Sequence, residues 1–173
     1  LSLEGKAYQL RAGTITAPVT GDVVITDTAA EMAVEAATGY VIIPIYLNAH
    51  IEAIGGALPE IAFKSVGAVI TTLGAAFTPL NLKINGPAAS GRAAVSAAGG
   101  VAVAAELNTT TRQIFGNTAV IAADADPLAD VFFDVPPVLV GPSSVYVQIA
   151  SATPGPTYFA SFDFIELTVG QIS

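Results

Sequence analysis

The segment Tyr40–Ala53 alternates in a way that a β-strand explains and a helix does not. Its odd positions are all apolar, whereas its even positions pass from apolar residues into Asn48, His50 and Glu52. Successive side chains of a strand point to opposite faces, so this period of two predicts a long strand with its odd positions in a core. The face formed by its even positions is expected to be buried at the beginning of the strand and exposed to solvent at its end. Pro44 cannot donate a ladder hydrogen bond, which predicts a sheet edge or a bulge at that point.

Two segments nearer the C-terminus carry a related signal. Residues Ser143–Ala150 alternate Val and Ile with Ser, Tyr and Gln. In residues 158–169 three large aromatic side chains up to Phe164 share even positions, whereas the aliphatic side chains after it occupy odd positions. This change of parity predicts a bulge near Phe164 or a strand that is buried on both faces. Shorter runs predict strands at 22–26, 61–72, 80–84, 101–107, 114–121 and 131–135. Residues 28–39 fit a capped helix or a strand, and the strand is favoured because it leads directly into residue 40.

Turn-forming residues separate these segments. Turns or breaks are predicted at Asn85-Gly86, Gly55-Gly56, Gly99-Gly100 and Pro154-Gly155-Pro156, with an extended linker at Pro136-Pro137. About nine short strands with such turns are typical of an all-β, antiparallel two-sheet sandwich. A chain of 173 residues suits one domain. We expect an N-terminal extension over residues 1–14 and a single domain over residues 15–173.

The composition leaves much of the surface uncharged. Apolar residues make up 53% of the chain and charged residues 12%, about half the usual share of charge. Uncharged surface of this kind favours contact with other subunits. The longest uncharged runs are broken by Thr, Ser, Asn, Pro and Gly, so no transmembrane segment is predicted. The chain starts at Leu1 without a charged-then-apolar leader, as a trimmed sequence would, and this leaves export open.

The charge balance argues against direct nucleic-acid binding. Fourteen acidic and six basic residues give a formal charge of −8. Proteins that hold phosphates concentrate Lys and Arg along them, and a polybasic patch would also be needed to dock on an anionic membrane. The basic residues here are scattered singly: Lys6, Arg11, Lys64, Lys83, Arg92 and Arg112.

Residues that could support catalysis are scarce. Cysteine is absent and His50 is the single histidine, so any hydrolytic triad must use that residue. The Ser90-Gly91 pair lacks the Gly-x-Ser-x-Gly pattern of a nucleophile elbow. We therefore interpret His50 as a partly exposed strand residue, and we expect no enzymatic activity, no catalytic residues and no cofactor.

Four aspartates form the one carboxylate cluster of the sequence: Asp124, Asp126, Asp130 and Asp134. Oxygen ligands two residues apart in a loop are typical of calcium sites, but Pro127, Leu128 and Ala129 break the EF-hand spacing. A solvated acidic loop is the favoured interpretation and a cation site the alternative. A glycosidase pair is disfavoured because the carboxylates lie on one loop and the chain has no Trp.

Three further patterns have ordinary explanations. Asn108-Thr109-Thr110 matches a glycosylation acceptor, which is common by chance. Gly99-Gly100 lacks the lysine of a phosphate-binding loop. The aromatic run of residues 158–164 is predicted to be a central core strand, or else a strand near a symmetry axis where rings of several subunits meet.

The order of these features resembles a known family. The features are the Ile43-Pro44-Ile45 step, a middle rich in small residues, the Val135-Pro136-Pro137-Val138 segment and the closing aromatic strand. Over roughly residues 15 to 169 they resemble small single-jelly-roll virion proteins of tailless viruses and phages. The closing strand is also similar to that of the tumour-necrosis-factor and complement-head group. The resemblance implies an eight-stranded jelly roll that self-assembles through its faces and edges.

These observations favour a structural virion protein, a capsid, cement or spike-head subunit found in a virion or at an extracellular surface. Its expected partners are copies of itself, as a trimer or larger assembly, and other virion proteins. No basic arm is present to neutralise a genome. The alternative is a non-catalytic binding module such as an adhesin head or a carbohydrate-binding sandwich, although no residue specifies a receptor or glycan. A hydrolase using His50 is the third and least favoured class.

Overall fold

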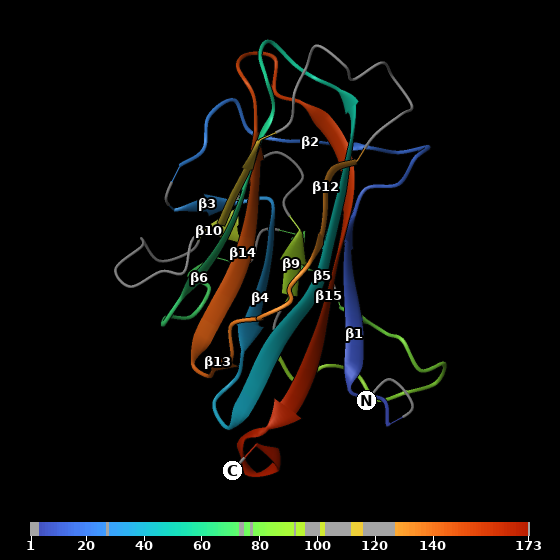
Figure 1. Cartoon of the computed structure of the whole chain (residues 1–173), viewed down its shortest axis with the longest axis vertical. Coiled ribbons are helices and arrows are strands. Elements are labelled where there is room, and N and C mark those ends of the chain that lie inside the picture. The colour runs from blue at the N-terminus through green and yellow to red at the C-terminus, as the bar shows by residue number, and fades with distance from the viewer. Residues whose placement is uncertain are drawn as a thin grey trace.

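The computed structural model describes residues 4–26, 28–72, 75–76, 78–91, 93–95, 101–102, 112–115 and 127–172. These residues form two antiparallel sheets that face each other (Figure 1). Apart from the single 3-10 turn Val169–Gln171, the described ranges contain no helix. The expected all-β sandwich is therefore confirmed.

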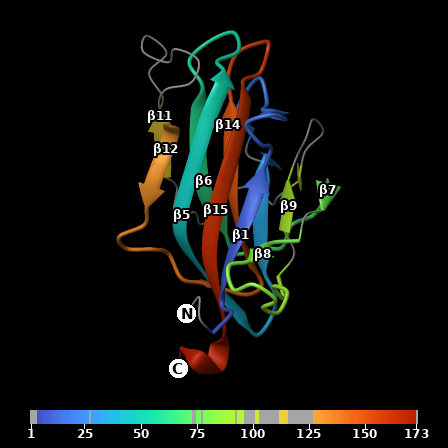
Figure 2. The same ribbon diagram turned by 90° about the vertical axis from the view of Figure 1, so that its right-hand side faces the viewer.

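Each sheet is assembled from strands far apart in the chain (Figure 2). The first sheet has the order β12 (Pro127–Phe132), β5 (Tyr40–Ala53), β15 (Thr157–Thr168), β1 (Ala7–Ala12) and β8 (Leu80–Asn81), with β13 (Leu139–Val140) beside β5 and β2 (Val19–Thr20) beside β15. The second has the order β11 (Arg112–Phe115), β6 (Glu60–Val66), β14 (Ser143–Ala150), β4 (Met32–Ala36), β9 (Ala93–Val95) and β7 (Ala75–Ala76). A separate ribbon pairs β10 (Val101–Ala102) with β3 (Ala29–Ala30).

Eight of these strands pair in a nested order. The outermost pair along the chain is β1 with β15, and inside it β4 pairs with β14. Further inside, β5 pairs with β12, and the innermost pair is β6 with β11. The chain thus resembles one long hairpin folded over on itself, with its turn between β6 and β11. The outermost pairs of such a hairpin form only when the two ends of the chain meet.

The space between the sheets holds the main core. Its large buried members come from both sheets and include Leu10, Met32, Leu47, Ile61, Ile149, Tyr158, Phe162 and Phe164. A smaller apolar cluster that includes Ala33 and Tyr146 forms on the opposite face of the second sheet. Strand β14 is therefore buried on both faces, with Val145 and Val147 in the main core and Tyr146 in the smaller cluster.

The long strand β5 contains a bulge. Its partner β15 pairs Asp163 with Tyr46 and Phe164 with Pro44, which leaves Ile45 as an extra residue on β5. On its other side β5 pairs with β12 up to Tyr46 and with β13 from Ile42, so the proline falls between two partner strands. The bulge that Pro44 predicted is confirmed, and it places the missing N–H donor where no ladder bond is required.

The bulge reverses which side chains of β5 face the core. Before it, the even position Ile42 belongs to the main core, whereas after it the odd positions Leu47 and Ala49 do. The prediction that every odd position lines the core is correct for Leu47, Ala49 and Ile51, whereas Ala53 at the end of the strand is exposed. It is wrong for Ile43 and Ile45, which are half-buried on the outer face, because one inserted residue shifts a period-two pattern by one position.

Several predicted strands have different bounds. The strand interpretation of residues 28–39 is confirmed by β3 and β4, and Ser143–Ala150 is confirmed as drawn. Residues 22–26 form no strand beyond one bridge from Asp22 to Ala150, and strands β6, β8 and β12 end at residues 66, 81 and 132. Parts of 101–107 and 114–121 lie outside the described residues. Residues 7–12, assigned above to an extension, form β1 within the first sheet, because their own alternation matches that of β15.

Three buried glutamates fasten loops to the sandwich. Glu31 accepts hydrogen bonds from the backbone N–H groups of Ile149 at 2.7 Å and Asp22 at 3.3 Å. Glu166 accepts those of residues 90 and 91 at 2.8 and 2.9 Å, and Glu35 accepts that of Ile70 at 2.9 Å. Each glutamate accepts hydrogen bonds from backbone N–H groups of another segment and so holds that segment against the sandwich.

Burial raises the pKa of Glu31 to about 8, an effect that the hydrogen bond from Ile149 opposes and the charge of Asp22 increases. The ordinary value is 4.5. Between these two pH values the folded protein keeps a proton that the unfolded chain releases. The contribution of Glu31 to stability is therefore complete below pH 4.5 and is lost as the pH rises through 8.

We expect the substitution Glu31→Gln to remove this part of the pH dependence. The amide keeps one acceptor oxygen, so the variant should be less stable than the unaltered protein at pH 5. This difference in the free energy of unfolding should shrink or reverse by pH 9, changing by at most about 1.4 kcal/mol per pH unit. Urea unfolding of both proteins at several pH values measures the difference. The exposed Glu52→Gln is the matched control, and stability curves that stay parallel for Glu31→Gln would contradict the prediction.

Candidate functional site

The outer face of the first sheet carries a belt of polar and aromatic side chains. These residues alternate with core residues along three neighbouring strands, so they project away from the second sheet. We call them the outer belt: Gln9 and Arg11 of β1, Tyr46, Asn48 and His50 of β5, and Phe159, Ser161 and Asp163 of β15. The belt begins on β5 just after the bulge, so the inserted residue decides which side chains join it.

One end of the belt is held by an acid and an amide. Gln9 donates from Nε2 to Oδ1 of Asp163 at 2.8 Å, and Arg11 donates from Nε to Oε1 of the same glutamine. Burial raises the pKa of Asp163, while the hydrogen bond from Gln9 and the charge of Arg11 act against the rise. The arrangement keeps a half-buried carboxylate hydrogen-bonded and close to the positive charge of Arg11.

A second network ties β5 to the edge strand. The Tyr46 hydroxyl donates to Oδ1 of Asp130 at 2.5 Å and accepts from Nδ2 of Asn48 at 3.2 Å. The hydrogen bond to Asp130 is the main cause that raises the pKa of Tyr46. The ring of Tyr46 also packs against Phe132, with ring centroids 4.5 Å apart.

The aspartate cluster of the sequence is only partly described. Asp130 lies within β12 and is bonded to Tyr46, whereas Asp134 follows the strand and is exposed. Asp124 and Asp126 lie outside the described residues, as do Asn108-Thr109-Thr110 and Gly99-Gly100. Within the described ranges no group of three metal-ligating side chains comes together.

A hollow opens beside Phe159 at one end of the belt. Its volume is about 320 Å³, and its lining includes Gly13, Arg11, Asn48 and Phe159. His50 stacks on Phe159 with centroids 4.9 Å apart and the two planes inclined by 11°. The position of Gly13 requires glycine, since its φ is +65° and a Cβ would lie 2.9 Å from the carbonyl oxygen of Tyr158. The hollow combines an aromatic ring with guanidinium and amide groups.

The structure does not bring Ser90 to His50. His50 pairs with Phe159, whereas the Ser90 backbone is held by Glu166 near the opposite end of the β5–β15 ladder. His50 is half-buried on the outer face, as expected for a strand histidine. The cross-strand stacking with Phe159 could not be inferred from the sequence, because it depends on the register between β5 and β15.

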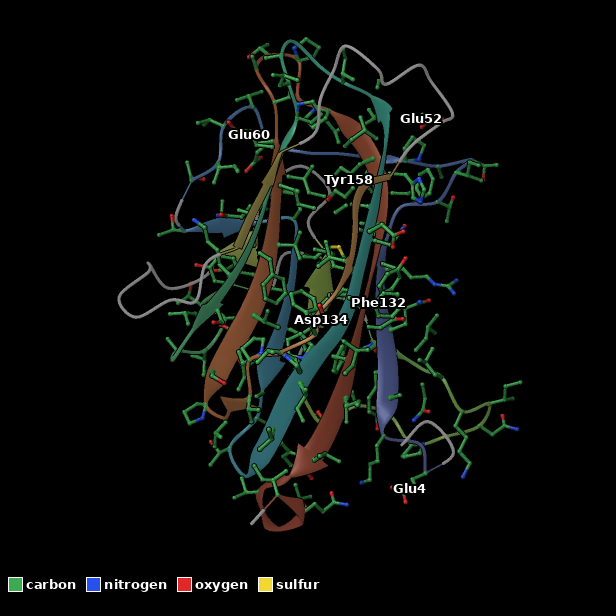
Figure 3. The ribbon with its side chains drawn as sticks, viewed as in Figure 1. Glu4, Glu52, Glu60, Phe132, Asp134 and Tyr158 are labelled. Carbon is green, nitrogen blue, oxygen red and sulfur yellow. The ribbon has the colours of Figure 1, made fainter. Side chains whose placement is uncertain are left out.

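The aromatic run forms a central core strand, which confirms the first of its two interpretations. Strand β15 lies between β5 and β1, and Tyr158, Phe162 and Phe164 belong to the main core. Figure 3 shows Tyr158 on this strand. Phe159 alone of the four rings in this run projects outward, into the belt. The second interpretation, a strand at a symmetry axis, stays a prediction.

Uncovered apolar side chains gather along both edges of the first sheet. The β12 flank consists of Phe132, Val135, Val138 and Val140, and the β8 flank of Leu80, Leu82 and Ile84. Figure 2 shows the strands β12 and β8, which lie beside the two flanks, on opposite sides of the sheet. The other exposed large apolar residues of the described chain are spread over loops and the C-terminal end. Exposed apolar side chains grouped at a sheet edge are a usual sign of contact with another protein.

Comparison with protein-family models, with curated proteins and with solved structures finds no match to this chain. In the part of the chain that the structure describes, no helix has the length and apolar character needed to span a membrane. Four of the six basic residues are described with their side chains, and Lys64 is one of them, buried in the second sheet. The outer belt and the two flanks are the surface features that bear on function.

We expect Gln9→Ala to destabilise the fold more at pH 7 than at pH 4. At neutral pH the variant leaves the ionised Asp163 without its amide donor, at a cost of about 1–2 kcal/mol. At pH 4 a larger share of Asp163 is protonated, because its pKa is raised, and the loss should be smaller. Urea unfolding at both pH values measures the two differences, and equal losses would contradict this account of the bond.

Proposed function

We propose that this chain is a structural virion protein, a capsid, cement or spike-head subunit that assembles with copies of itself through uncharged surfaces. The observation that carries the proposal is the pair of uncovered apolar flanks. Leaving Phe132, Val135 and Ile84 in water costs free energy that burial against another copy would recover. The proposed setting is a virion or an extracellular surface, with other virion proteins as further partners.

The strand order supports a jelly-roll assignment. An eight-stranded jelly roll is a double sheet of two Greek keys, a fold found in viral capsid and lectin domains. The orders β12-β5-β15-β1 and β11-β6-β14-β4, with nested pairing of first to last strand, are those expected when a long hairpin is rolled into two sheets. The edge strands β12 and β8 then become the places where neighbouring subunits meet.

The state of the polar residues favours assembly over catalysis. Asp130 and Asp163 are bonded to Tyr46 and Gln9, and the three buried glutamates hold backbone N–H groups. These carboxylates are occupied in keeping strands and loops in place. We accordingly propose that the protein acts without an enzymatic step.

The proposal predicts a discrete oligomer. Size-exclusion chromatography with light scattering should give a trimer or larger ring in solution at micromolar and higher concentrations, because the flanks are preformed. Electron micrographs of the native material should show copies in a closed arrangement. A strict monomer at the highest attainable concentration would overturn the proposal.

A second candidate function is glycan binding, favoured by the hollow beside Phe159. An aromatic ring can pack against the apolar face of a sugar, while the Arg11 guanidinium and Asn48 amide present fixed polar groups to its hydroxyls. This would make the chain a binding module such as an adhesin head.

The glycan candidate predicts saturable binding on a glycan array that Phe159→Ala abolishes. Phe132→Ala removes a ring of equal size outside the hollow and is the matched control. Loss of the signal in both variants, or no saturable signal from the unaltered protein, would contradict binding in the hollow.

A further inference from the structure

We infer that the two flanks are halves of one interface: the β8 flank of one copy docks head to tail on the β12 flank of the next, closing a ring. This inference rests on the proposed function and deepens it, because it names the surface and the partner, a second copy of this chain. It is carried by the shape of the β8 flank, the shape of the β12 flank and their opposite charges.

The β8 flank is a rigid knob. The side chain of Asn81 lies inside the turn, where Nδ2 donates to the carbonyl oxygens of Gly5 at 3.0 Å and Pro87 at 2.7 Å, and Oδ1 accepts from the N–H of Lys83 at 2.8 Å. A Cβ on Gly86 would lie 2.5 Å from this side chain, so the turn closes tightly around it.

The tip of this turn presents an aliphatic side chain to solvent. The backbone N–H of Gly86 donates to the carbonyl oxygen of Lys83 at 2.8 Å, and Asn85 has a φ of 61°, as the Asn-Gly dipeptide favours. Ile84 projects between these residues and is 89% exposed. Because the turn is already ordered, docking it would require little further loss of chain entropy.

The β12 flank is a preformed apolar strip. Phe132 is 67% exposed, and one side of its ring is supported by Tyr46. Val135, at 91% exposed, stands just before Pro136-Pro137, which restrict the backbone. Pairing of β13 with β5 fixes the far end of the strip at Val140. An aliphatic knob the size of Ile84 fits a strip of this chemistry.

The charged residues beside the two apolar flanks are opposite in sign. Lys83 precedes Ile84 on the knob, whereas Asp134 precedes Val135 on the strip, and both charged residues are exposed. Pairing two like flanks would set Lys83 against Lys83, or Asp134 against Asp134. Pairing unlike flanks sets opposite charges side by side, which favours a heterologous contact and gives it a register.

The positions of the flanks suit a closed ring. Figure 2 shows the segment after β12 and the segment after β8 on opposite sides of the first sheet. A head-to-tail contact between opposite sides of the same sheet places successive copies next to one another. Heterologous contacts of this kind close into rings when the rotation allows it.

Cysteine trapping tests the inference directly, because the natural chain has no cysteine. We would prepare Ile84→Cys and Val135→Cys separately and treat each alone, and then their mixture, with a short bis-maleimide linker. Head-to-tail docking predicts cross-linked dimers in the mixture and none in either variant alone. A chain with both substitutions should give a ladder ending at the ring size. The exposed Ile15→Cys, mixed with either variant, is the matched control and should give none.

Charge reversal supplies a second, independent measurement. Lys83→Glu and Asp134→Lys should each weaken assembly about tenfold or more in dilution experiments, and the double variant should recover most of that loss. Both residues are exposed, so folding should be unaffected, which far-ultraviolet circular dichroism checks.

The outcomes separate this inference from the proposed function. If the unaltered protein assembles but the mixture gives no cross-link, or each variant cross-links with itself, head-to-tail docking of the flanks is overturned while assembly stands. Single reversals without effect on an existing oligomer overturn it as well. An unaltered protein that stays monomeric overturns the proposed function and the inference together.

Discussion

The antiparallel pairing of β15 with β5 is the constraint on which the remaining structure depends. It joins the last strand of the chain to a strand from its first third, from the Thr157–Ala53 pair to the Thr168–Tyr40 pair. Strands β1 and β12 then add on either side of this pair, and its inner side chains cover the second sheet. The bulge at Ile45 within this ladder also selects which side chains form the outer belt.

A chain so poor in charge uses its carboxylates to hold its own structure. Glu31, Glu35 and Glu166 each satisfy backbone donors of a segment packed against the sandwich, and Asp163 is bonded across the outer belt. Burying a carboxylate is costly unless it is bonded, and in Glu31 the cost is visible as a raised pKa. The nested strand order makes such fastening necessary, because long segments must cross between the sheets.

The sandwich leaves apolar side chains exposed at two edges of its first sheet. The core is closed by strands whose partners come from distant parts of the chain, yet the edges at β12 and β8 retain apolar side chains in water. One edge ends in a turn locked by Asn81 and the other in a proline-stiffened strip. These preformed, oppositely charged edges connect the fold to the proposed assembly.

The sequence alone determined several of the strands and turns, because side-chain period and turn chemistry are local. It located Ser143–Ala150, the Asn85-Gly86 turn, the bulge at Pro44 and the core role of the aromatic run. Tertiary structure alone decided the register of β5 against β15, and with it that Ile43 and Ile45 face outward and that His50 stacks on Phe159. It also brought β1 into the sheet and set Ile84 and Val135 on opposite flanks. These features depend on which distant strands pair, and the local pattern of one strand does not specify its partner strand.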